Sequence, residues 1–374
     1  MSTNFQYDIH GIITVVSEVI LPELEPFRAG MEINHPTIEV KIGLPAANPE
    51  TFEPDSRYMR YREIFGSLGF ETGIEISPRG VRVVASPSLR LSPHVLYTNV
   101  VEPILRWTFV EKGYALVHGA TIAFGDRAYM ITARTDTGKT TTLLKILSHQ
   151  RREADRAAFL SDDMTIVSRD GMAYTYPKPM TISYHTLRAV NTEALTFRER
   201  LALPFQSRIH SRSGRRFAFL LSKTKLPCAT INMLVQMIVP PPKYNVDQLI
   251  PRVKLARQGR FAGIFVIERG PDTQMQIEAD EALEVLLENC EDAYGFPPYN
   301  DIKSFLYLNG REDLRETEHA IIRSALGNLP ATLIRNSNLD WWCRIPEFVD
   351  ESVARDCSCE QQPAHALQPS ASRA

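Results

Sequence analysis

The chain has 374 residues, of which 44% are apolar and 23% are charged, and its formal net charge is -2. Single hydrophobic cores usually stop growing at about 250 to 300 residues, so this length predicts two domains, or one domain with a sizeable accessory region. The near-neutral charge argues against nucleic acid or an anionic membrane as the main partner.

Residues 1–112 read as an N-terminal α+β accessory region. Strand-like apolar runs occur at 11–17 and 37–42, and a hairpin pattern joins 73–76 to 81–85 through a Ser-Pro-Arg-Gly turn. The chain starts without the basic, apolar and small-residue order of a secretion signal. No stretch approaches about 18 apolar residues, so we expect a cytoplasmic protein without a membrane span.

A helix is expected next in the chain. Ser92 stands where an N-cap is needed, with Pro93 at the first helical position, and apolar residues then recur at helical spacing. Gly113 ends this run, because glycine favours the end of a helix.

The core is expected over residues 113–355. The strand "YALVHGATIAF", a Gly-Asp-Arg turn and the strand "AYMITA" lead into "ARTDTGKT" and then into a helix with a leucine stripe. The run "AAFLSDD" ends on two aspartates, and "MTIVSRDGMAYTY" predicts a hairpin that turns at Asp170 and Gly171. Further strands are expected at 228–239 and 262–270, and a helix at 280–289.

The C-terminal residues 356–374 are rich in Pro, Ala, Ser and Gln, so we expect a disordered tail. The five cysteines are odd in number and show no CxxC spacing, so neither a disulfide framework nor a zinc site is indicated. Cys357 and Cys359 could bind metal or be redox-active, but reduced thiols in a loose tail are the favoured interpretation.

The segment from Ala133 to Thr140 matches a phosphate loop, with alanine in place of the commoner first glycine. Set between a strand and a helix, its backbone N–H groups can curl around phosphates while the helix N-terminus points at them. Lys139 would reach the β- and γ-phosphates, and the Thr140 hydroxyl would bind Mg²⁺. The residues expected at the nucleotide are Ala133, Arg134, Thr135, Asp136, Thr137, Gly138, Lys139, Thr140 and Thr141.

Asp162 and Asp163 follow Lys139 at the end of an expected strand, where they would share a sheet edge with the phosphate loop. One carboxylate can hold Mg²⁺ while the other accepts the proton of an attacking hydroxyl. The plainer alternative is a single magnesium-ordering acid with a solvated neighbour.

From "VHGATIAFGDRAYMITARTDTGKTTTLLKIL" to "FLSDD", the chain resembles the HPr kinase/phosphorylase family and, more distantly, the phosphoenolpyruvate carboxykinases. The resemblance implies an α/β (mixed α+β) P-loop core. It also implies that His118 lies beside the γ-phosphate or the metal, that Asp162 is the general base and that Asp163 binds Mg²⁺, or that the two acids have the reverse roles.

The chain departs from true HPr kinases at Thr141 and Thr142, where those enzymes usually carry a glutamate after the loop hydroxyl residue. Their later glutamate-containing signature is also absent from "MAYTYPKPMTISYHTL". We therefore expect a diverged relative that acts on another acceptor.

Some further residues have two interpretations. Lys178 and the pair Arg215 and Arg216 could contact phosphates, but solvated surface charge is the favoured reading. The aromatic segment 294–299 could line an acceptor pocket or simply pack. Trp341 and Trp342 are expected to be core or interface aromatics rather than ligand-stacking groups.

These observations predict an ATP-dependent kinase that uses Mg²⁺ and transfers the γ-phosphate to a hydroxyl of a small molecule, sugar or peptide serine. The alternatives are an HPr-type protein serine kinase/phosphorylase and a non-catalytic nucleotide-binding regulator. Nucleic acid is not expected as a partner, and the habit of the related family favours a homo-oligomer.

Overall fold

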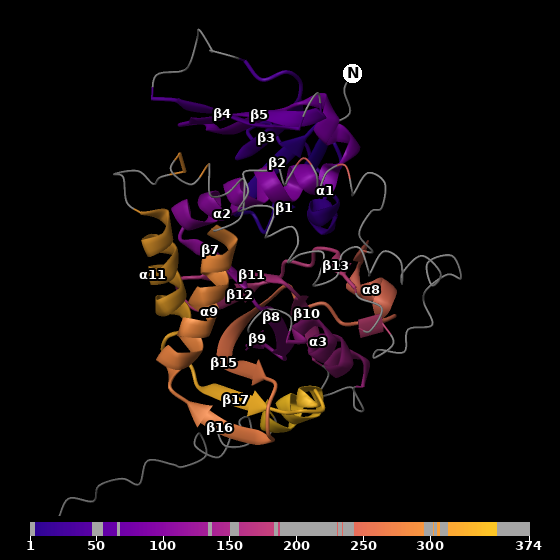
Figure 1. Ribbon diagram of the computed structural model, residues 1–374, viewed down its shortest axis with the longest axis vertical. Helices are drawn as coiled ribbons and strands as arrows, with labels where there is room; N and C mark the ends of the chain where they lie inside the picture. The colour runs from indigo at the N-terminus through magenta and orange to yellow at the C-terminus, as the bar shows by residue number, and fades with distance from the viewer. Residues whose placement is uncertain are drawn as a thin grey trace, which may run out of the picture.

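The protein is a mixed α/β structure with two main β-sheets. The computed structural model describes residues 4–46, 55–65, 68–133, 137–149, 157–182, 186–187, 230, 234, 243–294, 302, 305–306 and 313–349. The N-terminal sheet lies above the larger core sheet, with helices α1 (Pro93–Leu96) and α2 (Glu102–Glu111) between them (Figure 1).

The N-terminal sheet has the strand order β1-β2-β3-β6-β5-β4. Its strands are β1 (Phe5–Ile9), β2 (Ile13–Ser17), β3 (Ile38–Ile42), β4 (Arg57–Phe65), β5 (Leu68–Ser77) and β6 (Gly80–Ala85). The hairpin expected from the sequence is confirmed as β5 and β6. Its turn requires glycine, because Gly80 has φ 141° and a Cβ there would lie 2.7 Å from the carbonyl oxygen of Thr37.

The expected helix is confirmed from Pro93, with Ser92 at the N-cap position, but two of its details were not anticipated. The Ser92 side chain makes no capping hydrogen bond, and only its carbonyl accepts from the first turn. A π-helical turn, η3 (Tyr97–Val101), also interrupts the helix before α2. The helical layer packs on β2 on one side and on the core strand β7 (Tyr114–His118) on the other.

The run expected as one strand, "YALVHGATIAF", is two strands that part at Gly119. The first, β7, pairs with β11 (Met164–Ser168), whereas β8 (Ala120–Phe124) pairs with β9 (Arg127–Thr132) and β10 (Ala158–Ser161). The Gly119 amide donates to the carbonyl of Asp163 at 3.0 Å. This break places His118 at the end of a strand, next to the acidic pair.

The core sheet is organised around β15 (Gln258–Glu268), the strand expected at 262–270. It runs parallel to β9 and to β17 (Ala331–Arg335), and antiparallel to β12 (Met172–Tyr174). The β11 and β12 hairpin and helix α9 (Ala279–Tyr294) confirm two further predictions. The elements that were not anticipated include β16 (Thr273–Ile277), α11 (Leu314–Leu326) and β17.

Further short elements lie in both parts of the described chain. Helix α3 (Lys139–Ser148) follows the expected phosphate loop, and β13 (Met180–Thr181) pairs with β14 (Lys243–Tyr244). Helix α8 (Val246–Leu249) comes directly after β14, and residues 22–27 form the short helix η1 (Pro22–Phe27) of the N-terminal region.

Several predictions fall outside the described residues, namely the tail 356–374, the pair Arg215 and Arg216, and segment 295–299. Of the strand expected at 228–239, only Thr230 and Leu234 are described, and both are helical. No helix in the described part of the chain has the length and apolar character needed to cross a membrane.

One hydrophobic cluster extends through both sheets, from Tyr7 in β1 to Leu333 in β17. The domain boundary expected between residues 112 and 113 therefore falls between elements that share a hydrophobic core. This boundary stays a prediction. Within this cluster Arg106 of α2 donates to both carboxylate oxygens of Glu318 in α11, at 2.7 and 3.0 Å. Both side chains are almost fully buried, so each one neutralises the charge of the other at a place that water does not reach.

We predict that Glu318→Gln lowers the free energy of unfolding by about 3–5 kcal/mol, because it leaves the Arg106 guanidinium buried without its counter-charge. The matched control is Glu268→Gln, which breaks a half-exposed pair with Arg335 and should cost at most about 1 kcal/mol. Urea denaturation measures both. Equal losses in the two variants would contradict the prediction.

His10 gives the protein a pH dependence that can be measured. Its Nε2 lies 2.8 Å from the carbonyl oxygen of Thr175, which joins the N-terminal region to the core. Burial lowers the pKa of His10, and nearby Arg257 acts in the same direction, whereas the Thr175 hydrogen bond and Asp8 oppose them. Below pH 6.5 the His10 imidazole therefore binds a proton in the unfolded chain, whereas in the folded chain it binds that proton only at lower pH.

Stability should fall as the pH is lowered from 7 to 5, and His10→Asn should flatten part of that fall. Asparagine is chosen because His10 has φ 57°, which asparagine tolerates. Urea midpoints at pH 7, 6 and 5 test this, and an unchanged pH slope in the variant contradicts it.

Candidate functional site

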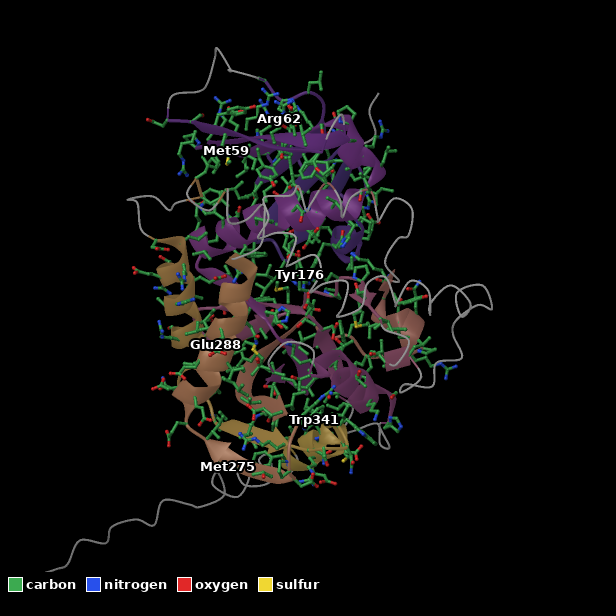
Figure 2. All side chains as sticks on the ribbon, in the orientation of Figure 1. Met59, Arg62, Tyr176, Met275, Glu288 and Trp341 are labelled. Atoms are coloured by element: carbon green, nitrogen blue, oxygen red, sulfur yellow. The ribbon has the colours of Figure 1, made fainter. Side chains whose placement is uncertain are left out.

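A cavity of about 730 Å³ lies between the N-terminal region and the core. Tyr176 lies at the junction with the N-terminal layer, and Trp341 lies lower in the core (Figure 2). Tyr97, whose hydroxyl contacts that of Tyr176, and Trp341 itself both line the cavity, so it extends between these two levels.

The lower part of the cavity is formed where β9 leads through the expected phosphate loop into α3. Gly138 has φ 127°, and a Cβ there would lie 3.4 Å from the ring of Trp341. The Lys139 ammonium donates to the Ala133 carbonyl at 3.2 Å. The strand and helix on either side of this segment are as expected, while Arg134, Thr135 and Asp136 lie outside the described residues.

A side chain from outside this segment holds its first residue in place. Asn289 of α9 is buried and donates to the Thr132 hydroxyl at 3.3 Å and to the Ala133 carbonyl at 3.2 Å. Its amide therefore fixes the point where β9 ends. No local pattern in the sequence singles out Asn289, because its partners are more than 150 residues away.

Asp162 and Asp163 form the link between β10 and β11, at the edge where α3 begins. The Thr140 hydroxyl donates to Oδ2 of Asp162 at 3.1 Å, whereas Oδ1 of Asp162 is buried without a hydrogen-bond partner among the described residues. Burial and the charge of Asp163 raise the pKa of Asp162 to about 7. The contact between Thr140 and Asp162 agrees with the prediction that the acids lie close to the end of the expected phosphate loop.

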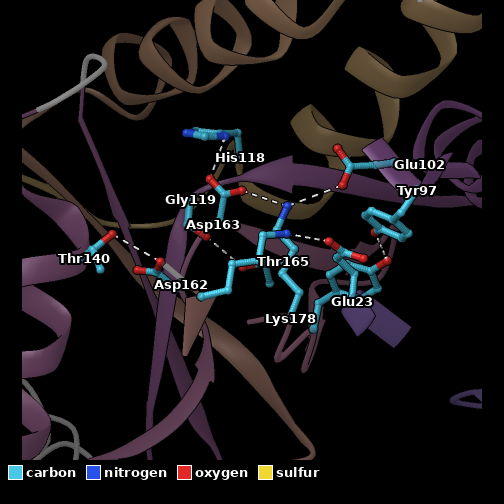
Figure 3. A network of polar contacts seen from close by, with 12 residues as sticks. Glu23, Tyr97, Glu102, His118, Gly119, Thr140, Asp162, Asp163, Thr165 and Lys178 are labelled. Atoms are coloured by element: carbon cyan, nitrogen blue, oxygen red, sulfur yellow. Dashed lines mark hydrogen bonds and ion pairs between the residues drawn. The ribbon is translucent and has the colours of Figure 1, made fainter. Parts of the chain in front are cut away.

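Asp163 opens onto the cavity, with 42% of its side chain exposed. It lies 3.3 Å from Nδ1 of His118 and 2.8 Å from the Lys178 ammonium (Figure 3). Burial would raise the pKa of Asp163, but Lys178 and His118 outweigh it and hold the pKa well below its usual range. Burial lowers the pKa of His118 to about 4, so its imidazole is neutral at pH 7.

Lys178 corrects one preference of the sequence analysis, which favoured a solvated surface charge. Only 15% of its side chain is exposed, and besides Asp163 its ammonium approaches Glu102 of α2 at 3.4 Å. Burial alone would lower the pKa of Lys178, but Asp163 and Glu102 raise it instead. The only signal in the sequence was the position of this lysine between Pro177 and Pro179.

At the upper end of the cavity, three residues that the sequence did not single out meet. Glu23 contacts both His94 and Lys243, although Lys243 is 220 residues away in the chain. Trp341 is buried, as expected of a core aromatic, while Trp342 is partly buried and packs against His149.

In the described part of the chain, no group of three or more His, Cys, Asp or Glu side chains is arranged to hold a metal. Mg²⁺ usually keeps several waters and takes only one or two carboxylates, with phosphates as further ligands. Thr140 and Asp162 fit such a site, because two adjacent oxygen ligands of an octahedral Mg²⁺ are about 2.9 Å apart. Oδ1 of Asp162, which has no hydrogen-bond partner in the described part of the chain, offers a further oxygen ligand.

Comparison of the chain with protein-family models and with curated protein sequences finds no match.

We predict that Lys178→Met lowers the free energy of unfolding by about 1–3 kcal/mol, because it leaves the carboxylates of Asp163 and Glu102 facing each other without a cation. Combining it with Glu102→Gln should restore part of that loss, since the variant then carries one uncompensated charge fewer. Lys112→Met, an exposed lysine at the end of α2, is the matched control and should change little. Strict additivity of the two site substitutions would contradict the proposed coupling.

Proposed function

We propose that the protein is an ATP-dependent kinase, related to the HPr kinase/phosphorylase group, that moves the γ-phosphate onto a hydroxyl. The observation that carries this proposal is the hydrogen bond between Thr140 and Asp162. It brings the first turn of α3 together with a pair of acids in a cavity large enough for a nucleotide and a small acceptor.

The donor end would be the start of α3. Backbone N–H groups and the positive end of this helix favour phosphate groups, and Lys139 adds a positive charge in its first turn. Thr140 and Asp162 would hold Mg²⁺, which neutralises charge on the phosphates when it is bound. Lys145, which also lines the cavity, adds a second cation on the same helix.

The sequence leaves two assignments of the acids open. The contacts favour the one in which Asp162 binds Mg²⁺ and Asp163 is the general base. Asp162 lies beside the Thr140 hydroxyl, where P-loop enzymes place the acid that orders Mg²⁺. Asp163 is more open to the cavity and is fixed from two sides by His118 and Lys178. We therefore assign Asp163 to orient the acceptor hydroxyl and to accept its proton, since geometry ranks before pKa in choosing a base.

In the transfer, the acceptor oxygen forms a bond to the γ-phosphorus as the bond from that phosphorus to the β,γ-bridging oxygen breaks. The electron pair stays on the β-phosphate of ADP, and the hydroxyl proton passes to Asp163. Lys139 and the amides of α3 stabilise charge on the transferring group. A nucleotide-binding regulator needs only one magnesium-ordering acid, so the arrangement of Asp163, His118 and Lys178 favours a kinase over that alternative.

Incubation of the purified chain with γ-labelled ATP, Mg²⁺ and a metabolite extract should yield a labelled small molecule. Lys139→Met should abolish the label, because it removes the cation expected at the transferring phosphate. The proposal is contradicted if the native chain does not bind ATP at millimolar concentration.

Two isosteric variants test the roles of the acids. Asp162→Asn should raise the Mg²⁺ concentration needed for tight ATP binding. Asp163→Asn should bind magnesium and ATP normally, yet lose about 10²-fold or more in transfer rate. The opposite pattern would restore the first assignment, with Asp162 as base and Asp163 as the metal ligand.

A further inference from the structure

The cavity continues beyond Asp163 and Lys178 to a polar cluster of Glu23, His94 and Lys243. Glu23 lies in η1, His94 in α1 and Lys243 in β14, so the N-terminal region supplies two of the three side chains. Glu23 and Thr140 lie on opposite sides of Asp163 and Lys178 (Figure 3). Relative to the expected phosphate site, the cluster is therefore on the acceptor side.

Glu23 is the incomplete member of this cluster. Its Oε1 accepts from Lys243 and contacts Nδ1 of His94, and only 1% of the residue is exposed. Its other oxygen, Oε2, is buried and has no hydrogen-bond partner among the described residues. A buried carboxylate oxygen without a donor costs free energy, so the site favours a ligand that brings an O–H or N–H group.

The charges around the cluster exclude an anionic ligand group. Lys243 is paired with Glu23, and Lys178 is paired with Glu102 and Asp163. No cation in this described cluster is therefore left over to balance a carboxylate or phosphate, and the Glu23 charge would repel one.

A hydroxyl group fits the hydrogen-bonding capacity that remains. It can donate to Glu23 and at the same time accept from an N–H of His94 or Lys243. Burial lowers the pKa of His94, and its Nδ1 lies against the Lys243 ammonium, so a neutral ring that accepts from Lys243 carries its N–H on Nε2. Thr98, whose hydroxyl donates to the His94 carbonyl at 2.9 Å, adds an acceptor oxygen to the same wall.

We propose that Glu23, His94 and Lys243 form the acceptor subsite and that it binds an uncharged small molecule with at least two hydroxyl groups, a polyol or a sugar. One hydroxyl bonds to Glu23, while another faces Asp163 and receives the phosphoryl group. The cavity volume of about 730 Å³ lies in the range of small-molecule pockets. The role of the second hydroxyl rests on the proposed kinase function, whereas the binding site does not.

Binding is therefore tested separately from transfer. Isothermal titration of the full chain is carried out with uncharged polyols and sugars of three to six carbons. Parallel titrations use the anion glycerate, the zwitterion serine and a serine-containing peptide, each with and without ATP and Mg²⁺. At least one uncharged polyol or sugar should bind, and glycerate, serine and the peptide should bind at least tenfold more weakly.

Glu23→Gln should weaken that polyol or sugar about tenfold or more, because a hydrogen bond to a charged group is lost. The control is Glu39→Gln, a carboxylate of β3 that pairs with Lys41 and Arg82 away from the cavity, and it should leave binding unchanged. If Glu23→Gln does not fold, His94→Gln serves in its place with the same expectation.

The outcomes separate the two proposals. Tightest binding of glycerate, serine or the peptide overturns the polyol site, as does failure of every polyol and sugar or unchanged affinity in Glu23→Gln. If ATP does not bind while a polyol still binds and responds to Glu23→Gln, the kinase function fails and the binding site stands.

Discussion

Lys178 reaches Asp163 at 2.8 Å from the segment that follows β12, while Glu102 approaches the same ammonium from α2. This buried cation ties the core sheet to the helical layer of the N-terminal region. Without it, three carboxylates, Glu102, Asp162 and Asp163, would lie around one cavity with less opposing charge, and their mutual repulsion would open the site. The position of Asp163 therefore depends on a residue from each of the two parts of the molecule.

The division of the predicted strand at Gly119 has a related consequence. Because β7 and β8 pair with different neighbours, the chain crosses from one part of the sheet to another just after His118. The Gly119 amide binds the Asp163 carbonyl, so the main chain at the acids is fixed next to the main chain at the histidine. Backbone pairing thus sets the distance between the two side chains before the side chains themselves interact.

The N-terminal region contributes to both the core and the cavity. Its helix α2 carries Arg106 into a buried pair with α11, and Glu102 to Lys178, while η1 and α1 carry Glu23 and His94 to the upper end of the cavity. A region that the sequence marks only as accessory thereby supplies one wall of the site.

The sequence by itself determined the features in which the partners are neighbours in the chain. These are the hairpins β5 and β6, and β11 and β12, the strand before Ala133 and the helix that begins at Lys139, and the placing of Asp162 and Asp163 at a strand end. Their periodicity and turn residues act over a few positions, so they can be read without knowledge of the fold. The tertiary structure alone decided the break at Gly119, the burial of Lys178 and the meeting of Glu23, His94 and Lys243. Those depend on pairing and desolvation between segments as much as 220 residues apart, and no local pattern records such contacts.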